Sequence, residues 1–208
     1  MSTPEEPGTQ PTREVELKAV VEDMRAARHA IEAKGARLVF TGRLEDRRYD
    51  TRDRALIAKD HVLRLRTYRT EKSVTAHLDW KGPTQVEGGF KVREELTSGI
   101  TDPDALAAIL EHLGYAVVRE IDRDIAQYGL GDTMIRFERY PRMDTLVEVE
   151  GSPDGIEKAI EALGIPRSAF TTERLADFVR AYEARTGVRA ALCARELSGD
   201  YRYTLKNA

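Results

Sequence analysis

The residues whose types and spacing could do chemistry begin with Glu14, Glu16 and Lys18, which alternate with the apolar Val15 and Leu17. A period of two is that of a β-strand, so the two carboxylates and the ammonium share one face of a strand. Carboxylate oxygens are ligands for hard divalent cations, and an ammonium binds an oxyanion as a point charge. One such strand is also typical of a solvated sheet edge, so its meaning depends on the rest of the chain.

Seven further segments are predicted as strands that carry one apolar and one charged face. They cover residues 37–50, 62–68, 73–81, 90–96, 115–128, 133–140 and 144–151. The charged residues on the polar faces are Arg64, Arg66, Lys81, Lys91, Arg93, Glu95, Arg119, Arg123, Arg136, Glu138, Glu148 and Glu150. Most of these strands are neighbours in sequence, which predicts an antiparallel sheet that curls or closes.

Helices are predicted from helical apolar patterns, and Asp23 and Asp102 are the predicted caps of the first two. They cover residues 23–35, 102–114, 153–163 and 171–186. Residues 1–12 carry three prolines and no periodic apolar residue, so we predict a disordered tail there. Residues 13–186 are predicted to be one folded domain, and residues 187–208 a C-terminal extension without a clear pattern.

The helices need an apolar sheet surface on which to pack. We therefore expect the apolar faces of the strands to point outward and the charged faces to line a central tunnel. The predicted fold class is α+β, an eight-stranded antiparallel β-barrel with a charged interior and helices packed outside.

The predicted tunnel contains nine cationic groups and six carboxylates, an excess of three positive charges. Burying so many charges costs several kcal/mol for each unpaired ion, so the set needs a ligand of opposite sign. A polyanion such as a triphosphate suits the cations. The carboxylates become favourable beside phosphates when Mg²⁺ or Mn²⁺ bridges the two.

The ordered motifs of the chain resemble those of the CYTH superfamily, also called the triphosphate tunnel metalloenzymes. They are Glu14-Val15-Glu16-Leu17-Lys18, Tyr49-Asp50-Thr51, Leu63-Arg64-Leu65-Arg66, Lys81-Gly82-Pro83, Arg93-Glu94-Glu95 and Glu148-Val149-Glu150. The resemblance covers residues 13–182. Class IV adenylate cyclases, thiamine triphosphatases and inorganic triphosphatases belong to this superfamily, and the Lys-Gly-Pro and Arg-Glu-Glu strings are most similar to the cyclase branch.

The resemblance implies roles for individual residues. Glu14, Glu16, Glu148 and Glu150 would bind metal, with Glu138 standing where the family often has an aspartate. Lys18, Arg64, Arg66, Lys81, Arg93 and Arg123 would bind phosphates, and Lys91, Arg119 and Arg136 join them as predicted tunnel-facing cations. Glu14, Glu16 and Lys18 are the predicted catalytic residues. The sixth strand departs from the family's Lys-x-Arg pattern because Ile121 stands between Arg119 and Arg123.

Three functions remain open from the sequence. The first is metal-dependent hydrolysis of a triphosphate, which the altered sixth strand favours slightly. The second is cyclisation of ATP to cyclic AMP and pyrophosphate, because the triphosphate and metal motifs do not separate these two reactions. The third is a binding module that holds polyphosphate without catalysis.

The composition limits partners and location. The 208 residues include 33 basic and 36 acidic side chains, a net charge of -3, so no overall field favours nucleic acid or an anionic membrane. Cys193 is the single cysteine, which excludes an internal disulfide framework and fits a cytoplasmic location. The expected partner is a small triphosphate-containing molecule, and a homodimer is compatible with the sequence.

Other features are assigned ordinary structural roles. The arginine-rich stretch 43–54 is predicted to be a solvated strand and loop, with a substrate-end role at the tunnel mouth as the alternative. Three of the four histidines are predicted to lie at the surface or rim, whereas His77 lies on a strand face that points into the tunnel.

Overall fold

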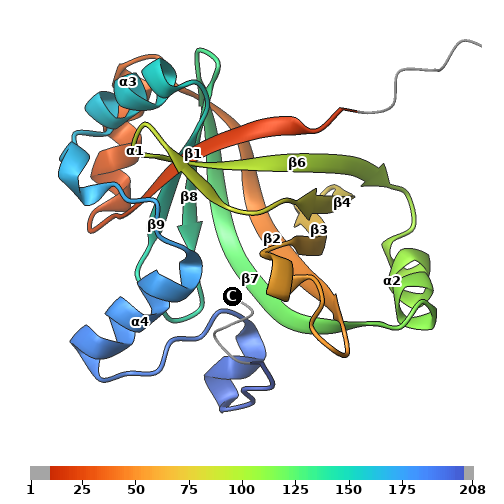
Figure 1. Cartoon of the computed structure of the whole chain (residues 1–208). Coiled ribbons are helices and arrows are strands. Elements are labelled where there is room, and N and C mark those ends of the chain that lie inside the picture. The colour runs from red at the N-terminus through yellow and green to blue at the C-terminus, as the bar shows by residue number, and fades with distance from the viewer. Residues whose placement is uncertain (1–9, 204–208) are drawn as a thin grey trace, which may run out of the picture.

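The structure is a computed structural model that describes residues 10–203. Nine strands form one antiparallel sheet in the order β1-β9-β8-β7-β2-β3-β4-β6-β5. The strands are β1 (Thr12–Val20), β2 (Arg37–Thr51), β3 (Val62–Arg69), β4 (Val74–Lys81), β5 (Gln85–Glu87), β6 (Phe90–Ile100), β7 (Tyr115–Leu130), β8 (Thr133–Arg139) and β9 (Leu146–Glu150). Because β1 also pairs with β6, the sheet closes into a barrel of eight strands, as predicted (Figure 1). The short β5, which was not predicted, pairs with β6 beyond the end of β4.

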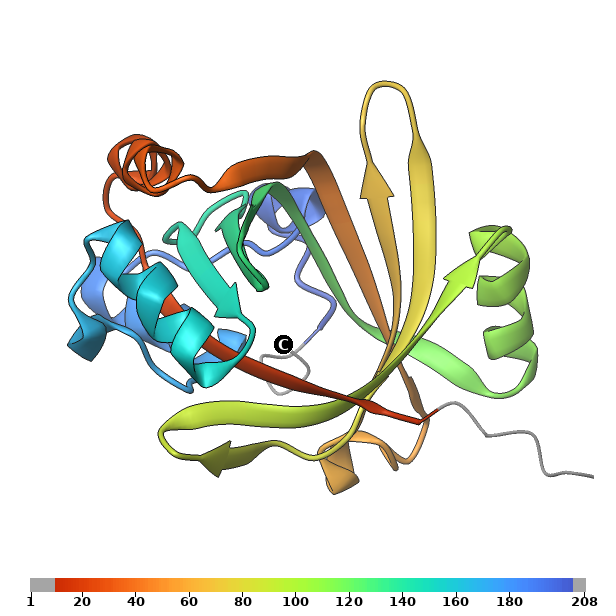
Figure 2. The same ribbon diagram turned by 90° about the horizontal axis from the view of Figure 1, so that it is seen from above.

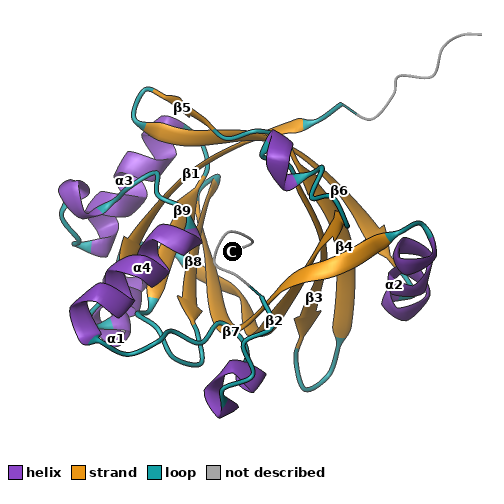
Figure 3. Cartoon of the chain, turned by 60° about the horizontal axis from the view of Figure 1, so that its bottom comes forward, coloured by secondary structure: helices purple, strands orange, loops and turns teal. Residues whose placement is uncertain are grey.

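The helices cover the outer surface of the barrel. They are α1 (Met24–Ala33), α2 (Pro103–His112), α3 (Pro153–Leu163) and α4 (Leu175–Thr186), with single 3-10 turns η1 (Ile57–Lys59), η2 (Arg167–Ala169) and η3 (Ala194–Ser198). Viewed along the barrel, α1, α3 and α4 lie on one side and α2 on the opposite side (Figure 3). No helix in the described part of the chain is long and apolar enough to cross a membrane.

The apolar faces of the strands point outward, as predicted. Leu17 of β1 and Phe137 of β8 pack with Ile31 of α1 and Ile156 of α3 in the largest core cluster, and all four are 1 % exposed or less. A second cluster lies beneath α2, where Leu65 of β3 contacts the apolar face of that helix. This arrangement removes aliphatic surface from water while leaving the charged faces of the strands inside the barrel.

Three of the four helices begin close to their predicted starts, and the predicted caps Asp23 and Asp102 are among their N-caps. The side chains of Asp23, Asp102 and Ser152 each accept a hydrogen bond from a backbone N–H in the first turn of the helix that follows. The fourth, α4, begins four residues later than predicted. Thr171 instead exchanges two backbone hydrogen bonds with Lys18, at 3.0 and 2.8 Å, which holds that segment against the edge of β1.

The C-terminal extension has defined structure over residues 187–203. β8 ends opposite Asp124, so the part of β7 that precedes Asp124 in sequence has no β8 partner on that side. The carbonyl of Leu192 replaces it by accepting a hydrogen bond from Asp122 N at 2.7 Å, and Ala191 pairs with Arg142. This segment (dark blue) lies below the lower end of the barrel in Figure 1, and in the view from above in Figure 2 it is seen within the outline of the strands. Residues 1–9 of the predicted N-terminal tail and residues 204–208 lie outside the described residues, and Thr12 already belongs to β1.

Candidate functional site

The barrel encloses a cavity of about 130 Å³ lined mainly by charged side chains. Ten basic and seven acidic groups face it, a surplus of three positive charges. They are Lys18, Arg48, Arg64, Arg66, Lys81, Lys91, Arg93, Arg123, Arg136 and Arg174 with Glu14, Glu16, Asp46, Asp50, Asp60, Glu138 and Glu148. Uncompensated cations in a closed space favour the entry of an anion.

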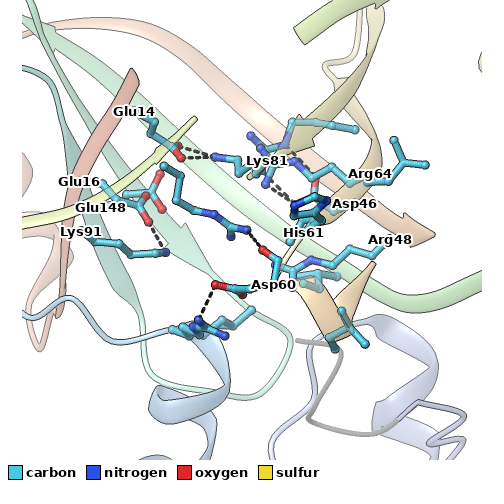
Figure 4. Close-up of a pocket in the computed structure, with 18 of the residues that line it drawn as sticks. Glu14, Glu16, Asp46, Arg48, Asp60, His61, Arg64, Lys81, Lys91 and Glu148 are labelled. Carbon is cyan, nitrogen blue, oxygen red and sulfur yellow. Dashed lines mark hydrogen bonds and ion pairs between the residues drawn. The ribbon is translucent and has the colours of Figure 1, made fainter. Parts of the chain in front are cut away.

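Carboxylates from β1 and β9 gather on one wall of this cavity (Figure 4). Both oxygens of Glu14 lie 2.5 Å from the ammonium of Lys81, and Glu16 accepts from Lys91 at 2.5 Å and from Lys18 at 2.8 Å. Lys18 also forms an ion pair with Glu148, which lies directly opposite it on β9. Burial alone would raise the pKa of Glu16, but Lys18 and Lys91 outweigh it and hold that pKa well below its ordinary value.

Glu150 lies next to this wall rather than among the residues that line the cavity. It pairs with Glu16 across the β1–β9 ladder. Burial, together with the charges of Glu14 and Glu148, raises the pKa of Glu150 to about 7. The carboxylates around it therefore create a negative potential that a cation would relieve, and they are the side chains that could hold a divalent metal. Among residues 10–203, no three acidic, histidine or cysteine side chains are already grouped as a metal cage.

An array of guanidinium groups occupies the opposite wall (Figure 4). Arg66 binds the carboxylate of Asp46 with two hydrogen bonds, Nε to Oδ1 at 2.8 Å and NH2 to Oδ2 at 3.0 Å. Arg123 donates to Asp46 Oδ2 at 3.0 Å, and Arg64 donates to Asp79 Oδ2 at 2.7 Å. Asp46 is 1 % exposed, so this buried carboxylate fixes the directions in which the arginines present their remaining N–H donors.

Glu138 joins the two walls. Its Oε1 accepts from Arg123 at 2.9 Å and from Arg136 at 3.2 Å, and its Oε2 accepts from the Tyr140 hydroxyl at 2.6 Å. Arg136 also forms an ion pair with Glu148. Burial would raise the pKa of Glu138, but the two arginines outweigh it and hold the pKa far below its usual range. The residue predicted as a metal ligand thus orients two guanidiniums in the structure.

Arg93 lines the cavity but is occupied by the backbone. Its Nε donates to the carbonyl of Gly82 and its NH2 to the carbonyl of Asp60, both at 2.7 Å. These bonds tie β6 to the Lys-Gly-Pro segment and to the loop before β3. The side chain therefore shapes one end of the cavity in addition to carrying charge there.

Arg119 is not among the residues that line the cavity. The pairing of β7 with β2 shifts between Arg48 opposite Arg119 and Tyr49 opposite Val117, so Val118 is an extra residue in a β-bulge. Arg119 lies 3.1 Å from Glu196 in the C-terminal extension, and its side chain is 3 % exposed. Alternation along the strand predicted that it would face the tunnel, but its guanidinium pairs with Glu196 and does not line the cavity. We therefore leave Arg119 out of the candidate site.

Sequence reasoning missed several cavity residues on β2 and at its end. The stretch 43–54 was predicted to be solvated, yet Asp46 and Asp50 are buried and both line the cavity with Arg48. Burial and the charge of Arg64 lower the pKa of Arg48 to about 9, so an anion nearby would be favourable. The alternation of residues 46, 48 and 50 was the signal that could have revealed them.

The other missed residues lie at the end of the cavity near α4. Arg174, immediately before α4, donates to Asp60 at 2.8 Å, and both line the cavity. His61 lines it as well and contacts Trp80 edge to face, with ring centroids 5.2 Å apart. His77, predicted to face the tunnel, lies instead beside Tyr68, at 5.8 Å between ring centroids, and is not among the lining residues.

A closed antiparallel barrel with opposed carboxylate and guanidinium walls defines a triphosphate tunnel protein. The sequence matches the CYTH domain over residues 12–162, and the chain belongs to this family. Members of the family bind triphosphates and generally use a divalent metal. The match ends before α4, so α4 and the C-terminal extension lie outside it. No curated protein shows significant similarity to the chain.

Solved structures with the same fold come from distant organisms. A candidate adenylate cyclase from Vibrio parahaemolyticus matches with a TM-score of 0.70 and 19% identity, covering 82% of this chain and 99% of its own. The protein PH1012 from Pyrococcus horikoshii matches with a TM-score of 0.65 and 17% identity, covering 79% and 98%. HpAC1 from Hippeastrum, whose dominant activity is described as triphosphatase, has a TM-score of 0.58 and 16% identity, covering 84% and 96%.

Proposed function

We propose that the protein is a divalent-metal-dependent hydrolase that binds a triphosphate inside the barrel. The observation that supports this most directly is the division of the cavity into two walls. Glu14 and Glu16 contribute carboxylates from one side, and Arg64, Arg66 and Arg123 contribute guanidiniums from the other. Phosphate oxygens suit the guanidiniums, and a metal suits the carboxylates, so one triphosphate–metal complex satisfies both walls.

Mg²⁺ or Mn²⁺ fits the donor set because all of the candidate ligands are carboxylate oxygens. We assign Glu14, Glu16 and Glu148 as ligands, with Glu150 beside them. A bound metal of this kind supplies Lewis-acid polarisation of a phosphoryl oxygen and an acidified water. Once the carboxylates are engaged by metal, the ammonium of Lys18 is available to a phosphate oxygen.

The cationic side chains bind and orient the phosphates in this proposal. Arg66, Arg123 and Arg136 offer planar N–H forks that hydrogen-bond two phosphate oxygens at once. Lys81 and Lys91 act as point charges between the walls. Because Asp46 and Glu138 hold the arginines in place before substrate arrives, little side-chain reorganisation is needed in the transition state.

Cyclisation of ATP is the second candidate function. The strings Lys81-Gly82-Pro83 and Arg93-Glu94-Glu95, which resemble those of class IV cyclases, favour it. Hydrolysis directs water to a terminal phosphorus, whereas cyclisation directs the ribose 3′-hydroxyl of ATP to the α-phosphorus and expels pyrophosphate. We favour hydrolysis slightly because β7 departs from the family's Lys-x-Arg pattern, with Ile121 between Arg119 and Arg123, and because Arg119 does not line the cavity.

One incubation series separates the possibilities. Purified protein is mixed with Mg²⁺ or Mn²⁺ and either tripolyphosphate or ATP, and orthophosphate, pyrophosphate and cyclic AMP are resolved chromatographically. Orthophosphate is the expected product, and Glu16→Gln is expected to lower its release at least about 100-fold, while the exposed control Glu71→Gln leaves it unchanged. Cyclic AMP would identify a cyclase, and binding without any product under either metal would identify a binding module.

A further inference from the structure

The two ends of the cavity differ in their exposure to solvent. At the end near α4, the side chains of Arg174 and Asp60, which both line the cavity, are 53% and 32% exposed. Ile57 of η1 also lines it there and is 37% exposed. Toward the other end the lining residues are almost completely covered, since Arg66 and Arg136 are 6% and 7% exposed. A molecule in solution therefore reaches the cavity from the α4 end.

A layer of apolar and aromatic side chains begins inside the barrel where the cavity ends. Asp46 of β2 and Arg66 of β3 are paired and both line the cavity, and Leu44 and Tyr68 are the next pair on the same face. His77 of β4 pairs with Arg66 and so shares that face. Leu44, Tyr68 and His77 do not line the cavity. They therefore lie in the barrel interior beyond the guanidinium wall.

β7 contributes to the same layer. Ile125 lies two residues after the cavity residue Arg123, on the same face, and pairs with Gly42 of β2. Leu44 and Ile125 are 0% and 3% exposed, yet neither belongs to the apolar clusters that pack outside the barrel. Other side chains in the barrel interior must therefore cover them.

Aromatic rings complete the layer. The rings of Phe40 and Tyr68 meet edge to face with centroids 5.3 Å apart, and those of Tyr68 and His77 are 5.8 Å apart. Gly42 allows this close packing, because a Cβ there would lie 3.0 Å from Phe40 Cζ and 2.2 Å from the carbonyl oxygen of Arg69. Side chains thus occupy this part of the opening seen between the ribbons in Figure 3. We call these five residues the interior plug: Phe40, Leu44, Tyr68, His77 and Ile125.

A phosphate chain cannot pass through an apolar layer, because each phosphate would leave water without gaining a cation or an N–H donor. We propose that the interior plug closes the barrel at the end away from α4, so that a phosphate chain enters end first and is never threaded through. The substrate then needs a free terminal phosphate, and the product leaves by the entrance. This inference rests on the proposed triphosphate site and adds the residues that decide which part of a chain the site accepts.

The number of protein copies bound to one long phosphate chain tests the closure. Wild-type protein is titrated calorimetrically with tripolyphosphate and with a linear polyphosphate much longer than the barrel. Ca²⁺ replaces Mg²⁺, because it binds the same oxygen ligands with looser geometry, and an orthophosphate assay checks that the chains stay intact. Only copies that excess tripolyphosphate displaces are counted.

A linear chain has two ends, so a barrel closed at one end binds at most two copies to each long chain. One copy is expected on each tripolyphosphate. More than two displaceable copies on one long chain would show that chains thread through the barrel and would overturn the inference.

Opening the interior plug provides the second measurement. Leu44→Ala combined with Tyr68→Ala is expected to raise the number of copies on a long chain above two. Tripolyphosphate affinity should change less than about fivefold, since Tyr68 meets the site only through the face of its ring, 6.0 Å from the guanidinium of Arg66. Leu38→Ala is the control, because Leu38 lies on the same strand and is 48% exposed, and it should change neither quantity. An unchanged number of copies in the folded double variant would overturn the assignment of the plug, and the wild-type titration decides the closure if that variant does not fold.

The two proposals fail in different ways. Binding of tripolyphosphate and of chain ends, with no phosphate released in Mg²⁺, would remove the hydrolase and leave the closure in place. Release of orthophosphate together with more than two copies on one long chain would remove the closure and leave the hydrolase. Absence of binding by any phosphate chain would remove both.

Discussion

Replacing Glu196 by glutamine tests how far the C-terminal extension stabilises the barrel. The side chains of Arg119 and Glu196 are 3 % and 2 % exposed, and their charged groups lie 3.1 Å apart. The second oxygen of Glu196 accepts from Leu192 N at 2.6 Å. Glutamine keeps an acceptor for that N–H and removes only the charge, so Arg119 is left buried without its ionic partner.

The magnitude follows from the burial of both partners. Breaking a fully buried ion pair by neutralising one member costs about 3–5 kcal/mol, because the remaining charge has lost both water and its partner. For a chain of this length, that loss lowers the melting temperature by roughly 6 to 20 °C. Burial already lowers the pKa of Arg119, so its charged form depends on Glu196. A second substitution, Arg119→Leu in the Glu196→Gln background, should recover most of the lost stability.

Urea unfolding followed by the fluorescence of Trp80, the single tryptophan, measures these changes. Glu157→Gln is a matched control, since its ion pair with Arg167 has side chains 47% and 41% exposed and should contribute less than about 1 kcal/mol. If Glu196→Gln costs no more than this control, the extension does not stabilise the barrel through the buried pair. A double variant as unstable as the single one would also contradict the reasoning.

Three further predictions concern the cavity. Burial would raise the pKa of Asp46, but Arg66 and its neighbours outweigh burial and hold that pKa well below its ordinary value. The ionised Asp46 carboxylate therefore stabilises the fold above about pH 4, and this contribution is lost as the pH falls toward the folded-state pKa. The Asp46→Asn variant should therefore be less stable than the wild type at pH 7, and its unfolding free energy should decline less steeply between about pH 5 and pH 2. Equal declines in the variant and the wild type would contradict this prediction. Mg²⁺ at about 100 times its Kd should stabilise the wild type by about 2.7 kcal/mol, visible as a thermal shift that Glu14→Gln removes; an undiminished shift in the variant would rule out that ligand. Arg136→Lys should raise the KM for triphosphate at least about tenfold, because an ammonium cannot form the two parallel hydrogen bonds of a guanidinium, and an unchanged KM would exclude bidentate binding.

The barrel could be predicted because the sequence of most strands shows one apolar face and one charged face. Over residues 63–66 of β3 and 147–150 of β9 the apolar and charged residues alternate, so the face of each of these side chains follows from its number. The helices could be placed because caps such as Asp102 act within one turn of the chain. Most of the predicted tunnel charges, including Glu16 and Arg136, line the cavity for the same local reason.

The missed features depend on partners distant in sequence. A bulge such as the one at Val118 adds one residue to one strand and leaves no trace in composition. The position of Arg119 depends on its ion pair with Glu196, a residue of the C-terminal extension. Along β2, charged residues on both faces hid the alternation that places Asp46 inside. The extension is ordered by contacts with Asp122 and Glu120, which no pattern within residues 187–203 reveals.

The closure of the barrel at β1, between β6 and β9, has a consequence for how the protein folds. Glu16 belongs to two ladders, since it pairs with Lys91 of β6 and with Glu150 of β9. β1 is synthesised before the other strands of the barrel, so it must wait for segments made much later before its backbone is fully paired, and such long-range closure is slow. Its alternating charges reduce edge-to-edge association with other chains during that interval. The residues proposed to bind metal would thus keep the nascent strand from aggregating before they acquire a site.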